Sequence, residues 1–222
     1  MRGTHQARYG AVMGDQPGTE LGLRGRKKLA TRRALSEAAL RLAAERGLEN
    51  VLVEDIAAAV GVSPRTFNNY FSSKQEAIVS LVVARAAGLC DAVAAQPPEM
   101  PLWEAIAEAA IRHVRPEESE QWRLGALLIR DTPALEAEQL RAYAGIESSL
   151  AVVIAARTGT DPRAALFPGL AASVAVGAIR AALRHWLDAG GDRSYPDLLR
   201  QVLRGVGAGL GEPGRPDHRL PR

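Results

Sequence analysis

Four polar side chains lie close together in the segment 64–70: Arg65, Thr66, Asn68 and Asn69. Their guanidinium, hydroxyl and amide groups are donors and acceptors of the kind that recognise base edges and phosphates in DNA. An arginine can donate two parallel hydrogen bonds to guanine, and an amide can form a matching pair with adenine. The chemistry that these residues offer is therefore recognition of a nucleotide sequence.

Two short helices joined by a tight turn are predicted to present these side chains. The first helix, about residues 54–60, has its apolar residues on one face and ends at Gly61, because glycine adopts a left-handed backbone without steric cost. Ser63 followed by Pro64 then starts a second helix, since the serine hydroxyl caps free N–H groups and proline suits the first helical position. This second helix is expected to end near Tyr70, which makes the segment a helix-turn-helix.

Basic residues concentrate around this motif. Residues 24–74 contain ten basic and five acidic residues, whereas residues 75–222 contain 16 basic and 18 acidic ones. A polyanion is therefore expected to meet only the first region. For Arg26 and Lys28, phosphate contact and a solvated basic face are both open interpretations.

Composition argues against several other classes of protein. The single cysteine, Cys90, allows no internal disulfide and no cysteine zinc cluster, and it is expected to be a small buried hydrophobe rather than a disulfide link in a dimer. The N-terminus has no continuous apolar leader, and the longest uncharged run, 164–179, is too short to span a membrane, so a cytoplasmic location is expected. The four histidines are scattered, and no catalytic motif or metal-ligand cluster is visible. We expect no enzyme activity, no catalytic residues, no metal and no cofactor.

Helical periodicity continues through most of the chain, so the fold class is predicted to be all-α with about nine helices. The residues 1–23 and 211–222 are expected to be a disordered arm and tail, with a mis-assigned start as the alternative for the arm. The first long helix is expected to bury Leu29 and Leu35, and Ser73 with Glu76 predicts the start of the next one. Besides the two motif helices, the predicted helices are 26–46, 74–95, 101–114, 119–130, 133–157, 162–189 and 195–210.

Three segments, TRRALSEAALRLAAERG (31–47), VEDIAAAVGVSPRTFNNYF (53–71) and SKQEAI (73–78), resemble the TetR family of bacterial transcriptional repressors. The resemblance implies that residues 24–84 form a three-helix DNA-binding domain and that residues 85–210 form an effector-binding and dimerisation domain. A later segment, 129–162, is similar to a TetR subgroup with an acyl-CoA-like ligand-binding C-terminal domain.

Individual site residues follow from this resemblance. Leu52 stands where most relatives place a threonine that caps a helix and touches a phosphate, and Asn68 stands where relatives usually carry an aromatic residue. The loss of the cap at Leu52 is expected to weaken the site by about 1 kcal/mol without abolishing binding. Asn68 is expected to change operator preference rather than remove DNA binding. The residues with implied base contacts are Pro64, Arg65, Thr66, Asn68 and, in support, Asn69; those with implied phosphate contacts are Lys28, Thr31, Tyr70 and Lys74.

The C-terminal region offers candidates for a ligand pocket, because aromatic rings with a few polar groups line many small-molecule sites. Each ring could instead belong to the core. The helices 162–189 and 195–210 are expected to form a homodimer that binds a near-palindromic DNA operator. The predicted function is a repressor released by a hydrophobic or acyl-CoA-like small molecule, with an activator or an effector-independent repressor as alternatives. The pocket candidates are Trp103, Trp122, Arg130, Tyr143, Phe167 and Arg180.

Overall fold

The computed structural model describes residues 22–113, 120–161, 163–190 and 194–209. Every regular element in these residues is helical, which confirms the predicted all-α class. The predicted arm and tail lie outside the described residues, apart from Gly22 and Leu23. The elements are α2 (Leu23–Arg46), the 3₁₀ turn η1 (Leu48–Asn50), α3 (Val53–Val60), α4 (Pro64–Tyr70), α5 (Lys74–Ala87), α6 (Leu89–Ala94), α7 (Leu102–His113), α8 (Glu120–Asp131), α9 (Pro133–Thr158), α10 (Leu166–Asp188) and α11 (Tyr195–Gly207).

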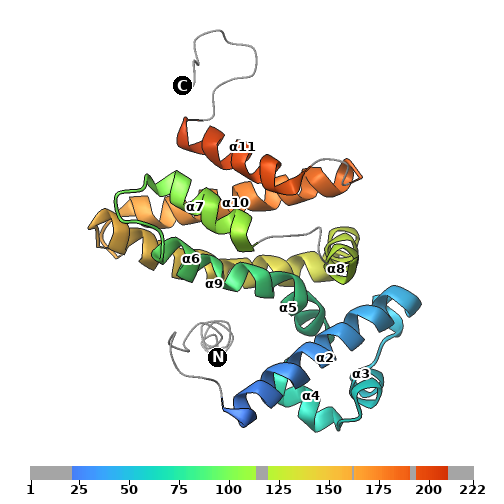
Figure 1. Ribbon diagram of the computed structural model, residues 1–222. Coiled ribbons are helices and arrows are strands. Elements are labelled where there is room, and N and C mark those ends of the chain that lie inside the picture. The colour runs from blue at the N-terminus through green and yellow to red at the C-terminus, as the bar shows by residue number, and fades with distance from the viewer. Residues whose placement is uncertain (1–21, 114–119, 162, 191–193, 210–222) are drawn as a thin grey trace. The chain divides into compact units, whose positions relative to one another are not determined.

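These helices form two compact units (Figure 1). The described part of the first unit comprises residues 22–85 and 120–143, that is α2 to α5, α8 and the beginning of α9. The second unit contains α6, α7, the rest of α9, α10 and α11. Segments far apart in the sequence therefore complete each unit.

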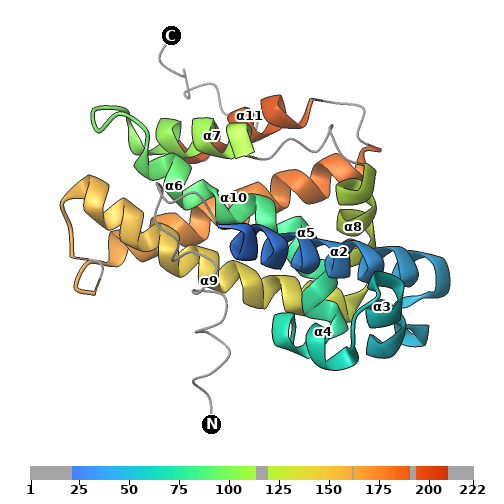
Figure 2. The same ribbon diagram turned by 60° about the horizontal axis from the view of Figure 1, so that its bottom comes forward.

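In the first unit, α2 supports the helix-turn-helix. Both ribbon views place α4 beside the N-terminal half of α2 and α3 beside its C-terminal half (Figures 1 and 2). Leu35, Ile56, Phe67 and Phe71 are fully buried, so one apolar core joins α2, α3 and α4. Burial of each such side chain contributes about 1.5–3 kcal/mol to folding.

The helix α8 approaches the same core closely at Gly125. A Cβ atom at this position would lie 3.0 Å from Cγ2 of Val82 and 3.4 Å from Cδ2 of Leu40. A larger residue here would push these two side chains away by a few tenths of an ångström. The glycine therefore lets α8 pack onto α5 and α2 within the first unit.

In the second unit, α11 packs against α7 and α10. A Cβ atom at Gly207 would lie 3.0 Å from Cβ of Trp103, so the close contact between α11 and α7 depends on this glycine. The rings of Trp186 and Tyr195 have centroids 5.6 Å apart, and Tyr195 is fully buried. These aromatic contacts fix α11 on α10.

A single arginine on α9 holds the connection between α6 and α7. The Nη1 atom of Arg157 donates to the carbonyls of Val93 at 3.3 Å and Gln96 at 2.9 Å. Its Nη2 atom donates to the carbonyls of Pro97 at 2.7 Å and Met100 at 3.1 Å. The guanidinium thus binds the backbone from the last turn of α6 through the connection that follows, and the carbonyls of Val93 and Pro97 accept from it in addition to the backbone N–H groups of Gln96 and Met100.

Two details differ from the sequence-based expectations. Leu29 is 54% exposed, because the first turns of α2 extend beyond the buried stretch that begins at Leu35. The predicted helix 74–95 is divided into α5 and α6, with the weak helix former Gly88 at the break. The other predicted helices are present with ends shifted by a few residues.

Two stretches, Lys74–Ala94 and Leu166–Asp188, are long and apolar enough to cross a membrane by length and composition. A core helix of a soluble protein meets the same criterion, and 60% of the first stretch is buried inside the protein. Only 33% of the second stretch is buried, so α10 presents apolar side chains at the surface.

Candidate nucleic-acid interface

Local capping fixes both helices of the helix-turn-helix. Gly61 has φ of 71° and ends α3 in the left-handed conformation. The hydroxyl of Ser63 accepts a hydrogen bond from the backbone N–H of Thr66 at 3.1 Å, and Pro64 occupies the first turn of α4. The sequence predicted the end of α3 at Gly61 and the cap of α4 at Ser63. The cap and Pro64 together place the start of α4 at Pro64.

The helix α4 has one buried face and one exposed face. Phe67 is fully buried, and its ring lies 5.6 Å from the ring of Phe71 between centroids. On the opposite side, Arg65, Asn68 and Asn69 are exposed. The exposed face of α4 therefore carries the guanidinium and the two amides that were predicted to contact bases.

The other predicted contact residues surround this face. Pro64 is exposed, and Thr66 and Tyr70 are half-buried at the two ends of α4. The hydroxyl of Thr66 lies 2.9 Å from the hydroxyl of Ser63. On α2, Thr31 donates its hydroxyl proton to the carbonyl of Lys27 at 3.0 Å, so it would have to rotate before donating to a phosphate.

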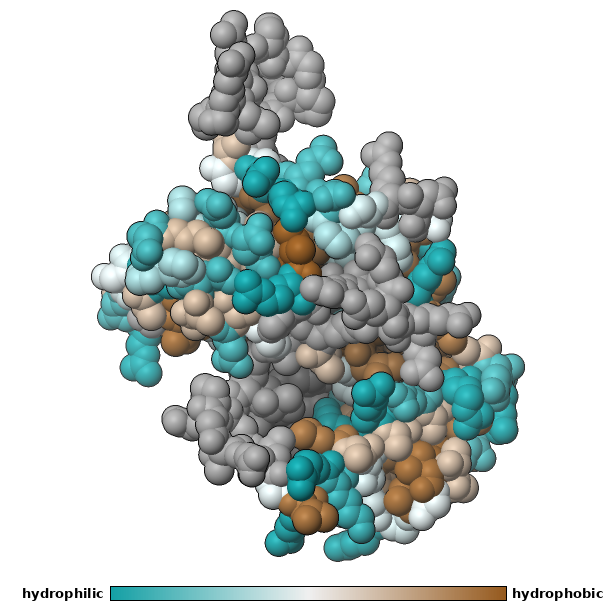
Figure 3. Space-filling view, viewed as in Figure 1, coloured by the Kyte–Doolittle hydropathy of each residue, from teal (hydrophilic) through white to brown (hydrophobic). Residues whose placement is uncertain are grey.

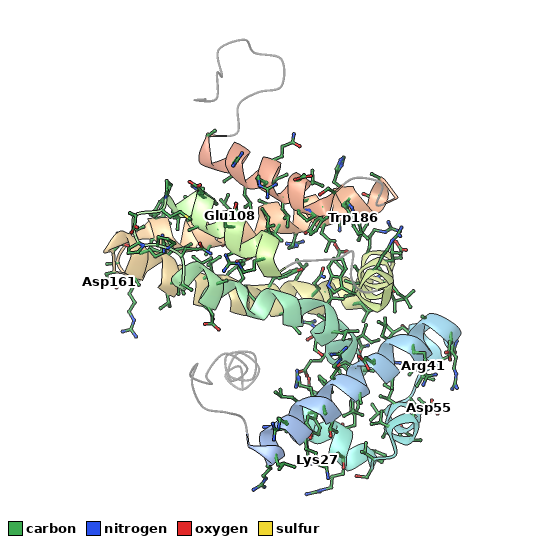
Figure 4. The ribbon with its side chains drawn as sticks, viewed as in Figure 1. Lys27, Arg41, Asp55, Glu108, Asp161 and Trp186 are labelled. Carbon is green, nitrogen blue, oxygen red and sulfur yellow. The ribbon has the colours of Figure 1, made fainter. Side chains whose placement is uncertain are left out.

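The start of α3 differs from that of a typical phosphate-binding helix. Leu52 occupies the N-cap position and is 60% exposed, and its side chain forms no cap hydrogen bond. Its backbone N–H donates instead to Oδ2 of Asp55 at 3.0 Å, and Figure 4 marks Asp55 on α3. A carboxylate thus occupies the position near the helix start where an incoming phosphate would be repelled.

Six of the cations of α2 form two groups, and Figure 4 marks one member of each, Lys27 and Arg41. In the middle of the helix Arg33 pairs with Glu37 at 2.8 Å, and nearer its C-terminal end Arg41 pairs with Glu45 at 3.3 Å. At the beginning of the helix no acidic residue lies in the first turn, and the basic side chains are exposed. We call this group the α2 tip; its residues are Arg24, Arg26, Lys27 and Lys28.

Charge and apolar surface are mixed on the module of α2, α3 and α4. The space-filling view shows hydrophilic and hydrophobic side chains side by side on its visible face (Figure 3). The exposed apolar residues of this module include Leu23, Leu29 and Leu52. Electrostatic attraction therefore depends on individual cations rather than on a uniformly basic surface.

Two further cations have internal partners that the sequence does not reveal. The ammonium of Lys74 donates to the carbonyls of Leu48 at 2.7 Å and Val51 at 2.8 Å. The Nη1 atom of Arg32 donates to the carbonyl of Tyr70 at 2.9 Å. Lys74 was predicted to contact a phosphate, and Arg32 was not identified as a site residue. Their partners lie 23 to 38 residues away, beyond the reach of sequence periodicity.

The six pocket candidates divide between the two units. Trp122 and Tyr143 are buried within the first unit, and Arg130 there binds the carboxylate of Asp131 at 2.7 Å, which lowers the pKa of Asp131. Trp103 and Arg180 are half-buried in the second unit. Phe167 is 46% exposed at the start of α10, which suits an interface better than a pocket lining. The ligand pocket stays a prediction.

Cys90 is buried in α6, as expected from the sequence. Burial, with a smaller effect of the Asp91 carboxylate, raises the pKa of its thiol from 9.0 to about 11. Thiolate is the reactive form of cysteine, so this residue is protected from oxidation. No cluster of three or more potential metal ligands occurs among the described residues.

Comparison with known protein families matches both parts of the chain. Residues 35–79 match the domain of the bacterial regulatory proteins of the tetR family, which includes α3, α4 and the start of α5. Residues 100–211 match the MftR C-terminal domain.

Individual relatives agree with this result. The chain is 31% identical over 194 residues to a protein of Mycobacterium tuberculosis described as a mycofactocin biosynthesis transcriptional regulator, MftR, with 84% of this chain and 94% of that protein covered. It is 40% identical over 149 residues to the HTH-type transcriptional regulator TcmR of Streptomyces glaucescens, a match that covers 63% of this chain and 66% of TcmR, just under two thirds of its length.

Solved structures show the same fold. The transcriptional regulator FadR of Bacillus subtilis, determined in complex with stearoyl-CoA, superimposes with a TM-score of 0.53 at 18% identity and covers 80% of this chain and 98% of its own. At this identity the likeness concerns the fold alone. Together, the helix-turn-helix geometry, the two matching domains and the MftR relative show that the chain belongs to the TetR family of transcriptional regulators.

Proposed function

We propose that this regulator is a homodimeric repressor that leaves its DNA operator when a hydrophobic or acyl-CoA-like small molecule binds. The observation that carries the DNA-binding part is the exposed face of α4, where Arg65, Asn68 and Asn69 stand opposite the buried Phe67. The helix has the polar surface that base recognition needs and a fixed apolar attachment.

The contacts with DNA are assigned by chemistry. Arg65 donates to guanine, Asn68 contacts adenine, and Pro64, Thr66 and Asn69 complete the surface that faces the bases. Tyr70, Thr31 and Lys28 contact phosphates and fix the register of the protein on the duplex. Residues 24–84 act as the DNA-binding domain and residues 85–210 as the effector and dimerisation domain.

The homodimer forms through α10 and α11. Leu166, Phe167 and Leu170 on α10 are 81%, 46% and 54% exposed, and a second copy of the chain would cover them. A two-fold dimer places two copies of α4 about 34–36 Å apart, which matches successive major grooves on a near-palindromic operator. Such a regulator would act in the cytoplasm, where its DNA lies.

The short connection between α4 and α5 supports the proposed release by a ligand. Only Phe71, Ser72 and Ser73 separate the end of α4 from Lys74, the first residue of α5. A ligand that binds more tightly to a conformation with a displaced α5 would change the spacing of the two recognition helices. The stearoyl-CoA complex of FadR supports acyl-CoA as the first ligand class to test.

The test uses a labelled DNA fragment from upstream of the gene that encodes this chain. Footprinting is expected to show one protected near-palindrome, and stearoyl-CoA is expected to release the protein, whereas CoA alone and stearate do not. Protection that persists at saturating stearoyl-CoA contradicts the ligand class. Equal affinity for the fragment and for random DNA contradicts the proposal that the protein binds a specific operator in this fragment.

A further inference from the structure

Two cations of the first unit donate hydrogen bonds to backbone carbonyls at the two ends of the helix-turn-helix. Lys74, just after α4, binds the segment just before α3. Arg32, on α2, binds the last residue of α4.

Lys74 joins the entrance of the motif to its exit. Its two acceptor carbonyls belong to Leu48 and Val51, which are 5% and 1% exposed, so the acceptors are held in place by the core. An ammonium group has three N–H donors, and two of them are used here at 2.7 and 2.8 Å. The segment from Val51 to Lys74, which contains both α3 and α4, is therefore closed at its base.

Arg32 fixes the C-terminal end of α4. The carbonyl of Tyr70 at this end has no partner within the helix and accepts from Arg32 at 2.9 Å. The guanidinium carbon also lies 4.2 Å from the ring centroid of the fully buried Phe71, a cation–π contact. A cation is favourable next to the negative end of the helix dipole.

The remaining cations near the motif are placed differently. The side chains of the α2 tip and of Arg65 are exposed and form no hydrogen bond or ion pair with any residue that the structure describes. They can meet a polyanion without first breaking an internal contact. The basic residues of the module thus separate into internally bonded and available groups.

We propose that Lys74 and Arg32 are positioning residues that set the orientation of α4, while the α2 tip supplies the charge that neutralises DNA phosphates and Arg65 stays available for contact with the bases. This proposal rests on the proposed binding of operator DNA. Lys74 then contributes to affinity through the geometry of α4. Its ammonium group neutralises no DNA phosphate and does not add to the salt dependence of binding.

The chain offers a direct test in its unmodified form, because Lys27, Lys28 and Lys74 are its only three lysines. Acetylation of amines, followed by mass spectrometry, measures the reactivity of each one with and without DNA. Lys74 is expected to react slowly in both states, whereas Lys27 and Lys28 react readily in the free protein and are protected by DNA. A Lys74 that reacts as readily as Lys28 and is protected only by DNA overturns the proposal.

Salt dependence of binding gives the second measurement. Lys28→Met is expected to lower the slope of log affinity against log salt by about 0.9, for operator and random DNA alike. Lys74→Met is expected to leave both slopes and the affinity for random DNA unchanged, and to weaken operator binding about tenfold. Lys74→Arg keeps donors for the two carbonyls and is expected to restore most operator binding.

The outcomes separate the two proposals. A loss of slope in Lys74→Met equal to that in Lys28→Met makes Lys74 a phosphate ligand. If Lys74→Met does not fold, the acetylation pattern of the unmodified protein still decides. If DNA protects neither Lys27 nor Lys28, the proposed DNA contact fails, while slow acetylation of Lys74 in the free protein still supports its internal bonds.

Discussion

Arg65 is the side chain to which we assign the main base contact of α4. It is exposed in the first turn of the recognition helix, and no described residue binds its guanidinium. A guanidinium in that state keeps all of its donors for guanine, so its removal affects binding without disturbing the core.

We predict that Arg65→Ala reduces the preference for the matched operator by about 1–3 kcal/mol, or about fivefold to 150-fold in relative affinity. Fluorescence anisotropy with operators mismatched at single base pairs would show the preference disappearing at one position in each half-site. Arg41→Ala is the control, because Arg41 is an exposed cation already paired with Glu45. Equal preferences for wild type and Arg65→Ala at every position would exclude this role.

Cys90 provides a second prediction at this scale. Since burial raises its pKa to about 11, the thiol is protonated and native protein is expected to resist iodoacetamide near neutral pH. The pKa of the thiol in the folded protein exceeds the value of 9.0 for a free thiol, so the unfolded chain loses this proton at lower pH than the folded protein does. The free energy of unfolding is therefore unaffected by this thiol below pH 9.0 and decreases as the pH rises from 9.0 toward about 11. Mass spectrometry would detect alkylation in denaturant only. Rapid alkylation of folded protein would show that the thiol is accessible.

Among single residues, those that act on close neighbours were predictable. Ser63 caps α4, Gly61 ends α3, and Ser73 accepts from the N–H of Glu76 at 3.0 Å, all as the sequence indicates. The internal bonds of Lys74 and Arg32 depend on where distant carbonyls lie after folding. The resemblance therefore implied a phosphate contact for Lys74, which stays a prediction, and gave no sign of the internal bonds of Lys74 and Arg32.

At the scale of elements, the start of α3 has no side-chain cap. Leu52 leaves the first N–H groups of the helix without a side-chain acceptor, while Asp55 already accepts from the backbone of Leu52. Half of a reciprocal capping box is therefore present. Leu52 is 60% exposed, so replacing it disturbs little of the core.

Leu52→Thr is expected to complete the box and to stabilise the protein by about 1 kcal/mol, with tighter operator binding through the added hydroxyl. Chemical denaturation and operator titration measure the two effects separately. Leu52→Ala is the matched control, because it removes the same apolar side chain without adding an acceptor. The capping argument fails if threonine and alanine give the same stability.

A comparison of predicted and observed helix ends shows which sequence patterns specify a helix boundary. α4 has the predicted ends because serine, proline and an aromatic core residue all specify them. The continuous apolar pattern over 74–95 outweighed the single sign of a break, Gly88, at which α5 and α6 are divided. Leu29 fitted the apolar stripe of α2, but a stripe is buried only where another element covers it.

At the scale of the whole molecule, the main open surface is α10. Its apolar stretch is only 33% buried in the single chain, which is unusual for a helix of this hydropathy unless another protein covers it. The sequence predicted the helical class and an interface at this helix. It did not predict that α8 and the start of α9 complete the first unit, because that depends on contacts between distant segments.

Leu170→Glu is expected to abolish the homodimer, since a carboxylate in an apolar interface costs several kcal/mol. Analytical ultracentrifugation should show half the mass of the wild type, and operator affinity should fall because two recognition helices are no longer linked. Leu124→Glu is the control, because Leu124 is 42% exposed on α8, outside the proposed interface. A dimeric Leu170→Glu protein would exclude this part of α10 from the interface.

The four carbonyls held by Arg157 make the connection between α6 and α7 suitable for a reporter group. These acceptors belong to the backbone, so the connection can tolerate new side chains while its path is retained. Glu99 in this connection is exposed, and the only native thiol, Cys90, is buried. Glu99→Cys would therefore accept a single fluorophore, and the regulator could be followed optically without removing any native residue that its core requires.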